Sequence, residues 1–316
     1  MRATAKLWTC AGVLFCAVIG FCASGAQAAF LLVSNANYNT ILKYNAQTGA
    51  YIGELVSTSS GGLTNPHGMA IGPDGRLYVA SAGNSQVLRY DSASGAFLGR
   101  FDQPSHLQTP IDLLFGPDQN LYVTSPFTDS IERFQGGTGS WLGRFGQGSL
   151  DSRPTGLAVG PGGDIYTTAF NWGSVERFTA GTGVRKPDFV TSGSGGLSAP
   201  RGLTFGPDGN LYVSSQGTNS VLKYNGATGA FLGTFVAPGS GGLDVPYGLS
   251  FGPDGNLYVA STNTFQVLRY NGGTGAFMNV FATGPVGQIA FSVFTPEPSL
   301  LALPMVLVVA AARRRR

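Results

Sequence analysis

The sequence predicts an all-β protein, a six-bladed β-propeller with four-stranded blades, and three observations lead to that prediction. A Gly-Pro-Asp-Gly type turn followed by an apolar strand recurs at steps of 44, 44, 46 and 46 residues. No stretch between these turns has the apolar spacing of an amphipathic helix. The chain has 48 glycines in 316 residues without a Gly-x-x period, and 43% of its residues are hydrophobic, which excludes collagen and disorder.

Each repeat supplies four short strands in the same order. The first strand precedes a turn such as 72–75, in which proline presets one backbone angle and glycine accepts a positive one. The second strand is continuously apolar, as in 77–79, and the third has the pattern of 87–90 (Val-Leu-Arg-Tyr). An Asn-x-x-Thr-Gly type turn then leads into the fourth strand. Four-stranded units of about 40–50 residues are typical propeller blades. The turns begin at Gly72, Gly116, Gly160, Gly206 and Gly252.

The sixth blade is expected to combine the two ends of the body. Residues 31–33 align with the second strand of a blade, and residues 41–44 align with the third. The missing first strand is expected at 287–291, near the other end of the chain, with its register defined to one residue either way. Such a blade closes the ring and removes the exposed sheet edges.

The first 28 residues have the pattern of a secretory signal peptide. A basic start is followed by an apolar run over 7–22 and by Ala26 and Ala28 at the cleavage site. The alternative, a transmembrane anchor, is disfavoured because the run is short and ends in the cleavable pattern. All three cysteines lie in this segment, so the exported body is expected to have no disulfide.

The last residues, 295–316, contain three ordered elements: Pro296, Glu297 and Pro298, then an apolar run over 300–312, then four arginines. The run is shorter than the roughly 20 residues that span a bilayer comfortably. These elements resemble a PEP-CTERM sorting tail. The resemblance implies processing by an exosortase-like enzyme and transient membrane contact. The expected organisation is therefore a signal peptide (1–28), a propeller (29–294) and a sorting tail (295–316), with the protein at the cell surface or in the extracellular matrix.

The basic charge of the chain belongs to its ends. Six of the 19 basic residues and one of the 16 acidic residues lie in the two terminal segments, so the body carries a net charge of about −2. A body with this balance has no electrostatic footprint for nucleic acid, and we expect no nucleic-acid partner.

The body, residues 30–294, resembles NHL-repeat propellers and their relatives, including the virginiamycin B lyase and gluconolactonase groups. The turn and strand signatures above carry this resemblance, which implies the architecture. It implies little about activity, because these groups share blades and differ in chemistry. Lactonase-type members use carboxylates and an asparagine around a divalent cation, and lyase-type members use a histidine base beside a metal-binding acid.

The two rims of the predicted propeller differ. The rim formed by the Gly-Pro-Asp-Gly and Asn-x-x-Thr-Gly turns, here called the turn rim, is uniform and is expected to be structural. The opposite rim, here called the variable rim, carries the loops after each second strand and the loops between blades. Its aromatic, Asn and Thr residues suit stacking on sugar rings or contact with a peptide, although such rings can also simply cover blade edges. The candidate binding residues are Tyr38, His67, Phe127, Trp172, Arg201, Tyr247 and Phe265.

Few residues of the body suit catalysis. Its only histidines are His67 and His106, and two of its three glutamates, Glu132 and Glu176, fall inside third strands. Asp112 beside His67 near the expected channel mouth is the one suggestive pair. We therefore assign no catalytic residue, metal ligand or cofactor; a divalent cation belongs only to the enzyme alternative.

One basic residue recurs in the third strand of every blade. A position that every blade shares is expected to be structural, through pairing with a turn aspartate or capping of carbonyls, rather than a binding ring. The six residues are Lys43, Arg89, Arg133, Arg177, Lys223 and Arg269.

These observations favour a non-catalytic binding module for a polysaccharide or an extracellular protein. Two alternatives stay open. One is a propeller lyase or lactonase with a divalent metal at the channel mouth, and the other is a structural matrix protein without a ligand.

Overall fold

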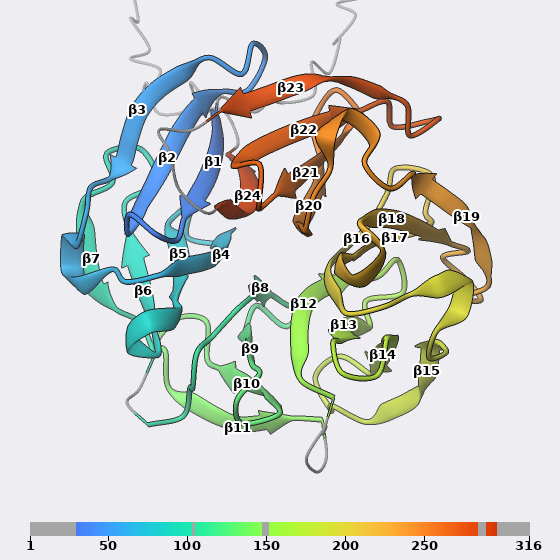
Figure 1. Ribbon diagram of the computed structural model, residues 1–316. Helices are drawn as coiled ribbons and strands as arrows, with labels where there is room; N and C mark the ends of the chain where they lie inside the picture. The colour runs from blue at the N-terminus through green and yellow to red at the C-terminus, as the bar shows by residue number, and fades with distance from the viewer. Residues whose placement is uncertain (1–29, 103–104, 147–151, 284–288, 296–316) are drawn as a thin grey trace, which may run out of the picture.

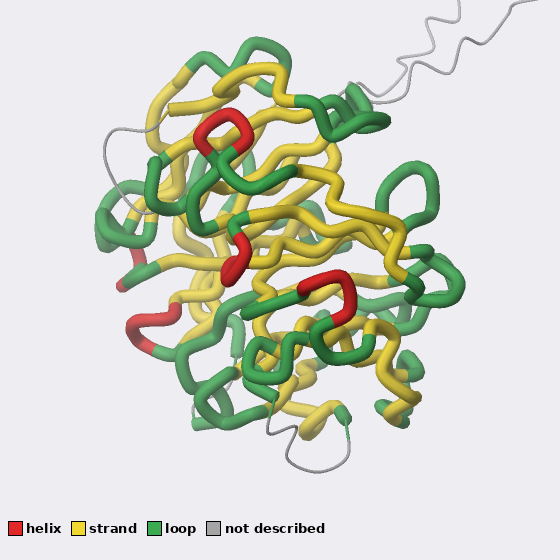
Figure 2. Tube along the Cα trace, turned by 45° about the vertical axis from the view of Figure 1, so that its right-hand side comes forward, coloured by secondary structure: helices red, strands yellow, loops and turns green. Residues whose placement is uncertain are grey.

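Six four-stranded antiparallel sheets surround a central axis in the computed structural model, which describes residues 30–102, 105–146, 152–283 and 289–295 (Figure 1). This arrangement confirms the predicted six-bladed propeller. The helical segments of the described residues are single 3-10 turns in the loops, which Figure 2 shows in red among the yellow strands.

Each blade runs outward from an innermost strand that lines the central channel. Blade 1, the closing blade, has the order β24 (Ile289–Thr295), β1 (Phe30–Asn35), β2 (Thr40–Asn45) and β3 (Tyr51–Val56). Blade 2 comprises β4 (Pro66–Ile71), β5 (Leu77–Ser81), β6 (Gln86–Tyr90) and β7 (Phe97–Arg100). Blade 3 comprises β8 (Leu113–Phe115), β9 (Leu121–Ser125), β10 (Ser130–Phe134) and β11 (Trp141–Phe145).

The remaining blades follow the same order. Blade 4 comprises β12 (Pro154–Val159), β13 (Ile165–Ala169), β14 (Ser174–Phe178) and β15 (Arg185–Val190). Blade 5 comprises β16 (Pro200–Phe205), β17 (Leu211–Ser215), β18 (Ser220–Tyr224) and β19 (Phe231–Val236). Blade 6 comprises β20 (Pro246–Phe251), β21 (Leu257–Ser261), β22 (Gln266–Tyr270) and β23 (Phe277–Thr283). The 3-10 turns are η1 (Ser60–Gly62), η2 (Ala82–Asn84), η3 (Ser194–Gly196), η4 (Gln216–Thr218) and η5 (Ser240–Gly242).

The tyrosine of the second strand joins neighbouring blades. The Tyr212 ring meets Phe235 of its own blade edge-on at 4.8 Å and Phe251 of the next blade at 5.0 Å between centroids. Its hydroxyl donates a hydrogen bond to Asp208 Oδ2 at 3.0 Å, in the Pro-Asp-Gly turn. The Tyr212 side chain therefore has two roles: its hydroxyl binds Asp208 in the turn, and its ring packs between the two blades. The corresponding tyrosines Tyr78, Tyr122, Tyr166 and Tyr258 also lie edge-on against phenylalanines.

The recurring basic residue pairs with the turn aspartate of its own blade. Lys223 Nζ lies 2.8 Å from Asp208 Oδ2, and Arg269 pairs with Asp254 in the same way. Arg177 Nε lies 4.0 Å from Asp164 Oδ2. The predicted structural role of this position is confirmed in blades 4, 5 and 6, so no basic ring is left free there for a ligand.

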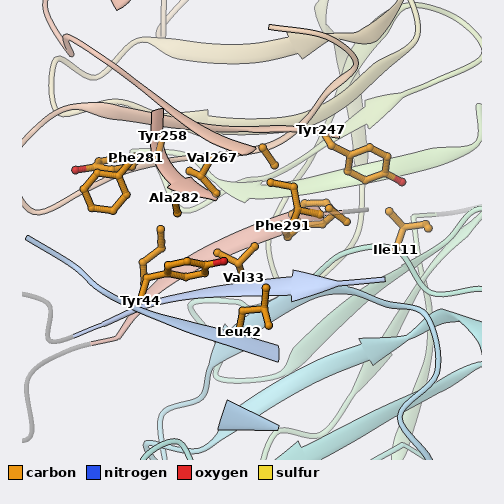
Figure 3. Close-up of a cluster of buried hydrophobic side chains, with 14 residues drawn as sticks. Val33, Leu42, Tyr44, Ile111, Tyr247, Tyr258, Val267, Phe281, Ala282 and Phe291 are labelled. Atoms are coloured by element: carbon orange, nitrogen blue, oxygen red, sulfur yellow. The ribbon is translucent and has the colours of Figure 1, made fainter. Parts of the chain in front are cut away.

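The closing strand β24 lies slightly later in the sequence than the segment expected at 287–291. Ser292 pairs with Val33 as Met69 pairs with Val79 in blade 2, so Phe291 takes the place that Gly68 holds there. The register expected for 287–291, to one residue either way, was therefore wrong, because residue 287 was expected at the place that Phe291 takes. Residues 287–288 lie outside the described residues. Figure 3 shows the core between blade 6 and the closing blade, where Tyr258 and Phe281 face Val33 and Tyr44.

Two predicted segments cannot be compared with the structure. The signal peptide with Ala26 and Ala28, and the sorting motif Pro296, Glu297 and Pro298, lie outside the described residues. Among the residues that are described, no helix has the length and apolar character needed to cross a membrane.

Candidate functional site

The innermost strands bring three of the predicted residues together at the variable-rim end of the channel. His67, Arg201 and Tyr247 each follow the proline that begins an innermost strand. The His67 and Tyr247 rings lie 5.7 Å apart, and Arg201 Nη1 donates a hydrogen bond to Tyr247 Oη at 3.3 Å. The closing blade has the small Ala290 at this position, which leaves space for Tyr247 of blade 6 to reach His67 of blade 2.

Cationic and aromatic side chains alternate from this point across the rim. The Arg201 guanidinium lies 4.8 Å from the Tyr247 ring centroid and 4.2 Å from that of Phe170. Arg153 lies 5.2 Å from both Phe170 and Phe127. Each such contact contributes about 0.5–2 kcal/mol, depending on how far it is removed from water. The set is called the mouth cluster below and comprises His67, Phe127, Arg153, Phe170, Arg201 and Tyr247.

The arginines of the mouth cluster have no acidic partner among the described residues. Arg201 Nε donates to Gln216 Oε1 at 2.5 Å, and burial lowers the pKa of Arg201. His67 is only 9% exposed, and its Nδ1 has no hydrogen-bond partner in the part of the chain that the structure describes. Burial, and secondarily the Arg201 charge, lower the pKa of His67 to about 4. The imidazole is therefore neutral at physiological pH.

Asp112 lies one residue deeper in the channel wall and ties two blades together. Its Oδ1 accepts the Leu113 amide and its Oδ2 accepts the Leu157 amide of blade 4, both at 2.9 Å. Burial raises its pKa to about 7 despite these hydrogen bonds. No hydrogen bond joins it to His67 among the described atoms, so the suggestive pair of the sequence is not a hydrogen-bonded pair in the structure.

Glycine allows the close approach of the innermost strands at this level. A Cβ on Gly156 would lie 2.4 Å from the Arg201 carbonyl oxygen, and one on Gly202 would lie 2.7 Å from that of Tyr247. The same strands line a channel cavity of about 280 Å³, with Leu113 and Leu203 but also Asp112 and Ser292 in its wall. Because this cavity is small, a large polar ligand would bind at the rim rather than inside the channel.

Three predicted residues lie outside the mouth cluster. Trp172 is 41% exposed, and its ring lies 5.9 Å from the Arg185 guanidinium. Tyr38 and Phe265 are also exposed and make no ring contact with the residues that the structure describes. These residues stay predictions for a wider binding surface.

Sequence reasoning missed Arg153. It directly precedes the inter-blade Pro154 and has a positive φ of 55°. Asn65, Ala199 and Val245 hold the same position in other blades with φ between 47° and 52°. The residue before this proline therefore varies between blades as the residue after it does, and that variation is the signal that could have identified Arg153.

A second hollow of about 500 Å³ lies beside blade 3, with Ser85, His106, Glu132 and Trp141 in its wall. The His106 and Trp141 rings stack at 4.0 Å, and Trp141 Nε1 donates to Glu132 Oε2 at 2.7 Å. The other strand glutamate, Glu176, accepts from Arg185 at 2.9 Å. Both glutamates thus bond inside their own blades, as their positions in third strands suggested.

The mouth cluster does not suit a divalent cation. Hard cations need several oxygen ligands, with carboxylates foremost, whereas the cluster presents two guanidinium groups, a neutral histidine and a phenol. The described residues contain no group of three His, Cys, Asp or Glu side chains that could hold a metal ion. Two uncompensated positive charges would repel a cation at this place.

The sequence profile of the virginiamycin B lyase family matches residues 56–277. No curated protein matches the chain. Among solved structures, a chain of a nidogen/laminin complex is similar with a TM-score of 0.68 and 18% identity, over 84% of this chain and 98% of that one. Virginiamycin B lyase from Staphylococcus aureus is similar with a TM-score of 0.52 and 19% identity, over 74% and 71%. A streptogramin B lyase has a TM-score of 0.54 and 18% identity, over 86% and 76%. At these identities the structures show a shared fold.

Proposed function

The chain belongs to the virginiamycin B lyase family, and within that family we propose that it is a non-catalytic module that binds an extracellular polysaccharide at its variable rim. The mouth cluster is the observation that carries this proposal. It joins aromatic faces with hydrogen-bond donors, which are the groups that stack on sugar rings and bind their hydroxyls.

The residues of the mouth cluster suit binding better than proton abstraction. A general base works best with a pKa near the operating pH, and burial holds the pKa of His67 at about 4. Asp112, the carboxyl that the sequence suggested as a partner of His67, is occupied by two backbone amides. We therefore derive no catalytic step from these side chains.

Binding is tested by isothermal titration of the purified protein with extracellular polysaccharides from its host. We expect Trp172→Ala and Tyr247→Ala to weaken binding by about 1–2 kcal/mol each. Trp172 presents an exposed aromatic face, whereas the buried Tyr247 ring positions Arg201 and His67. Tyr51→Ala is the control, because Tyr51 is an exposed ring that directly follows a turn of the turn rim. Unchanged affinity in both rim variants would exclude the variable rim as the binding surface.

Family membership supports a second candidate, a lyase that acts on virginiamycin B or a related compound. This activity is tested by incubating the protein with virginiamycin B and Mg²⁺ and following loss of the compound by liquid chromatography. Turnover that His67→Gln abolishes would replace the binding proposal with the lyase. A structural matrix role without any ligand is what remains if neither turnover nor binding is found.

The terminal segments support a proposal about delivery. The signal-peptide pattern and the PEP-CTERM-like tail fit export, transient membrane contact and processing by an exosortase-like enzyme. We propose on this ground that the propeller acts at the cell surface or in the matrix. Mass spectrometry of the exported protein tests this. A first residue at Ala29 and loss of the four terminal arginines are the expected results.

A further inference from the structure

The two arginines of the mouth cluster carry positive charge that the described part of the protein does not balance. Arg201 uses Nε for Gln216 and Nη1 for Tyr247, so Nη2 has no protein acceptor among the described atoms. The Arg153 side chain contacts the Phe127 and Phe170 rings and makes no hydrogen bond to the residues that the structure describes. Removing a guanidinium from water is unfavourable unless an anion or acceptors compensate it. Arg100, by comparison, has such a partner in Asp102 at 2.6 Å.

The acids near these arginines are occupied by backbone amides. Asp129 Oδ1 accepts the Arg153 amide at 2.9 Å, and no ion pair joins the two side chains. Asp112 accepts the amides of Leu113 and Leu157. The two guanidinium groups therefore contact aromatic rings, and Arg201 also contacts the Gln216 side-chain amide. Neither is paired with a carboxylate among the described residues, so both charges can pair with an anionic ligand.

His67 supplies an independent observation at the same place. Its imidazole is nine-tenths buried against Tyr247, and Nδ1 lacks a hydrogen-bond partner among the described atoms. A buried polar atom without a partner is rare in folded proteins, because it forfeits its hydrogen bond with water. An acceptor or donor on a bound molecule would complete it.

We propose that the mouth cluster binds a carboxylate on a sugar, so that the ligand is an acidic, uronate-bearing polysaccharide. This inference rests on the proposed polysaccharide binding and specifies the class of its ligand. The planar guanidinium matches a carboxylate with two parallel hydrogen bonds. Phe127, which is 59% exposed, and the half-buried Phe170 offer aromatic surface for a sugar ring beside the charge, while the buried Tyr247 positions Arg201.

The test compares polygalacturonate with the same polymer fully methyl-esterified, by isothermal titration of the full-length mature protein. The ester keeps the sugar backbone and removes the charge. We expect binding to the acid form and at least tenfold weaker binding to the ester, because hydrogen bonds to charged groups contribute about 1.5–3 kcal/mol. Raising NaCl toward 0.5 M should weaken the acid form selectively, since salt screens exposed charges.

Matched variants test whether the two arginines bind the carboxylate. Arg201→Gln and Arg153→Gln should each weaken binding of polygalacturonate by about 10–100-fold. Arg76→Gln removes the same charge from the turn rim, where Arg76 lies 3.6 Å from Asp74, and should leave affinity unchanged. Melting temperature monitors folding, and Arg153→Gln serves as the main variant if Arg201→Gln unfolds, because Arg153 makes no side-chain hydrogen bond among the described residues.

Each other outcome overturns the inference in a recognisable way. Equal binding of acid and ester, or equal loss in Arg76→Gln, rejects the carboxylate while the proposed polysaccharide binding survives. Binding of neutral glucans alone would also reject the carboxylate and leave the proposed polysaccharide binding intact. Binding of polyglutamate but of no polysaccharide would indicate a protein ligand, and it would reject both the uronate ligand and the proposed polysaccharide binding. The absence of any binding would reject both as well.

Discussion

The turn rim and the variable rim are formed by the same repeats but differ in how their charged side chains are paired. On the turn rim, Asp208 accepts from Tyr212 and pairs with Lys223, and Asp254 pairs with Arg269 in the same way. On the variable rim, Arg153, Arg201 and the Nδ1 of His67 lack such partners among the described residues. The difference indicates that the repeated positions serve the fold and that the unrepeated ones are free to serve a ligand.

The largest expected effect is the loss of stability when the tyrosine beside a turn of the turn rim is removed. Tyr212→Ala removes a fully buried ring from between Phe235 and Phe251 and should lower the free energy of unfolding by about 3–5 kcal/mol. Urea denaturation measures it. Tyr212→Phe should lose only about 1 kcal/mol, since it keeps the ring and loses one hydrogen bond. Equal losses in the two variants would contradict the packing role.

A second prediction concerns pH at the variable rim. Because burial lowers the pKa of His67 from 6.5 to about 4, the unfolded chain binds more protons than the folded protein between these values. Stability should therefore fall as pH falls from 6.5 to 4, by on the order of 3 kcal/mol. Comparison with His67→Gln across this range isolates the effect, since the variant lacks the titrating group. A parallel decline in both proteins would show that other groups cause it.

Asp112 has the opposite sign of pH dependence. Its pKa is raised to about 7, so the unfolded chain loses its proton first and stability falls as pH rises from about 4 toward 7. Urea denaturation of Asp112→Asn, which cannot ionise, should show a shallower decline over that range. The same slope in both proteins would mean that Asp112 is ionised when folded.

The smallest expected effect is that of breaking one ion pair on the turn rim, which tests whether this rim contributes to binding. Lys223→Gln breaks an ion pair whose side chains are 23% and 38% exposed, and such pairs contribute about 0–1 kcal/mol. Thermal unfolding should shift by a few degrees at most, and ligand affinity should not change. A loss of affinity would show that the turn rim also takes part in binding.

The sequence predicts the fold better than the site because the two depend on different information. The repeat period and the turn residues define the blades, and the alignment of 31–33 with a second strand leads directly to the closing blade. The bounds of β24 were harder because Phe291 stands where most blades have glycine. The position of Tyr247 after its proline could be predicted, but its contact with His67 depends on the small Ala290 in another blade. The stacking of Arg153 and Arg201 on Phe170 depends on loops without a repeat to compare.

The first and last described residues, Phe30 and Thr295, are neighbours on the turn rim. They pair between β1 and β24, which Figure 1 shows side by side. The Phe30 amide donates to Thr295 Oγ1 at 3.2 Å. Anything joined to either end of the propeller therefore attaches to one side of the disc. A tether at the carboxyl end would act as a stalk and display the opposite side, with its arginines and aromatic rings, outward to the surroundings.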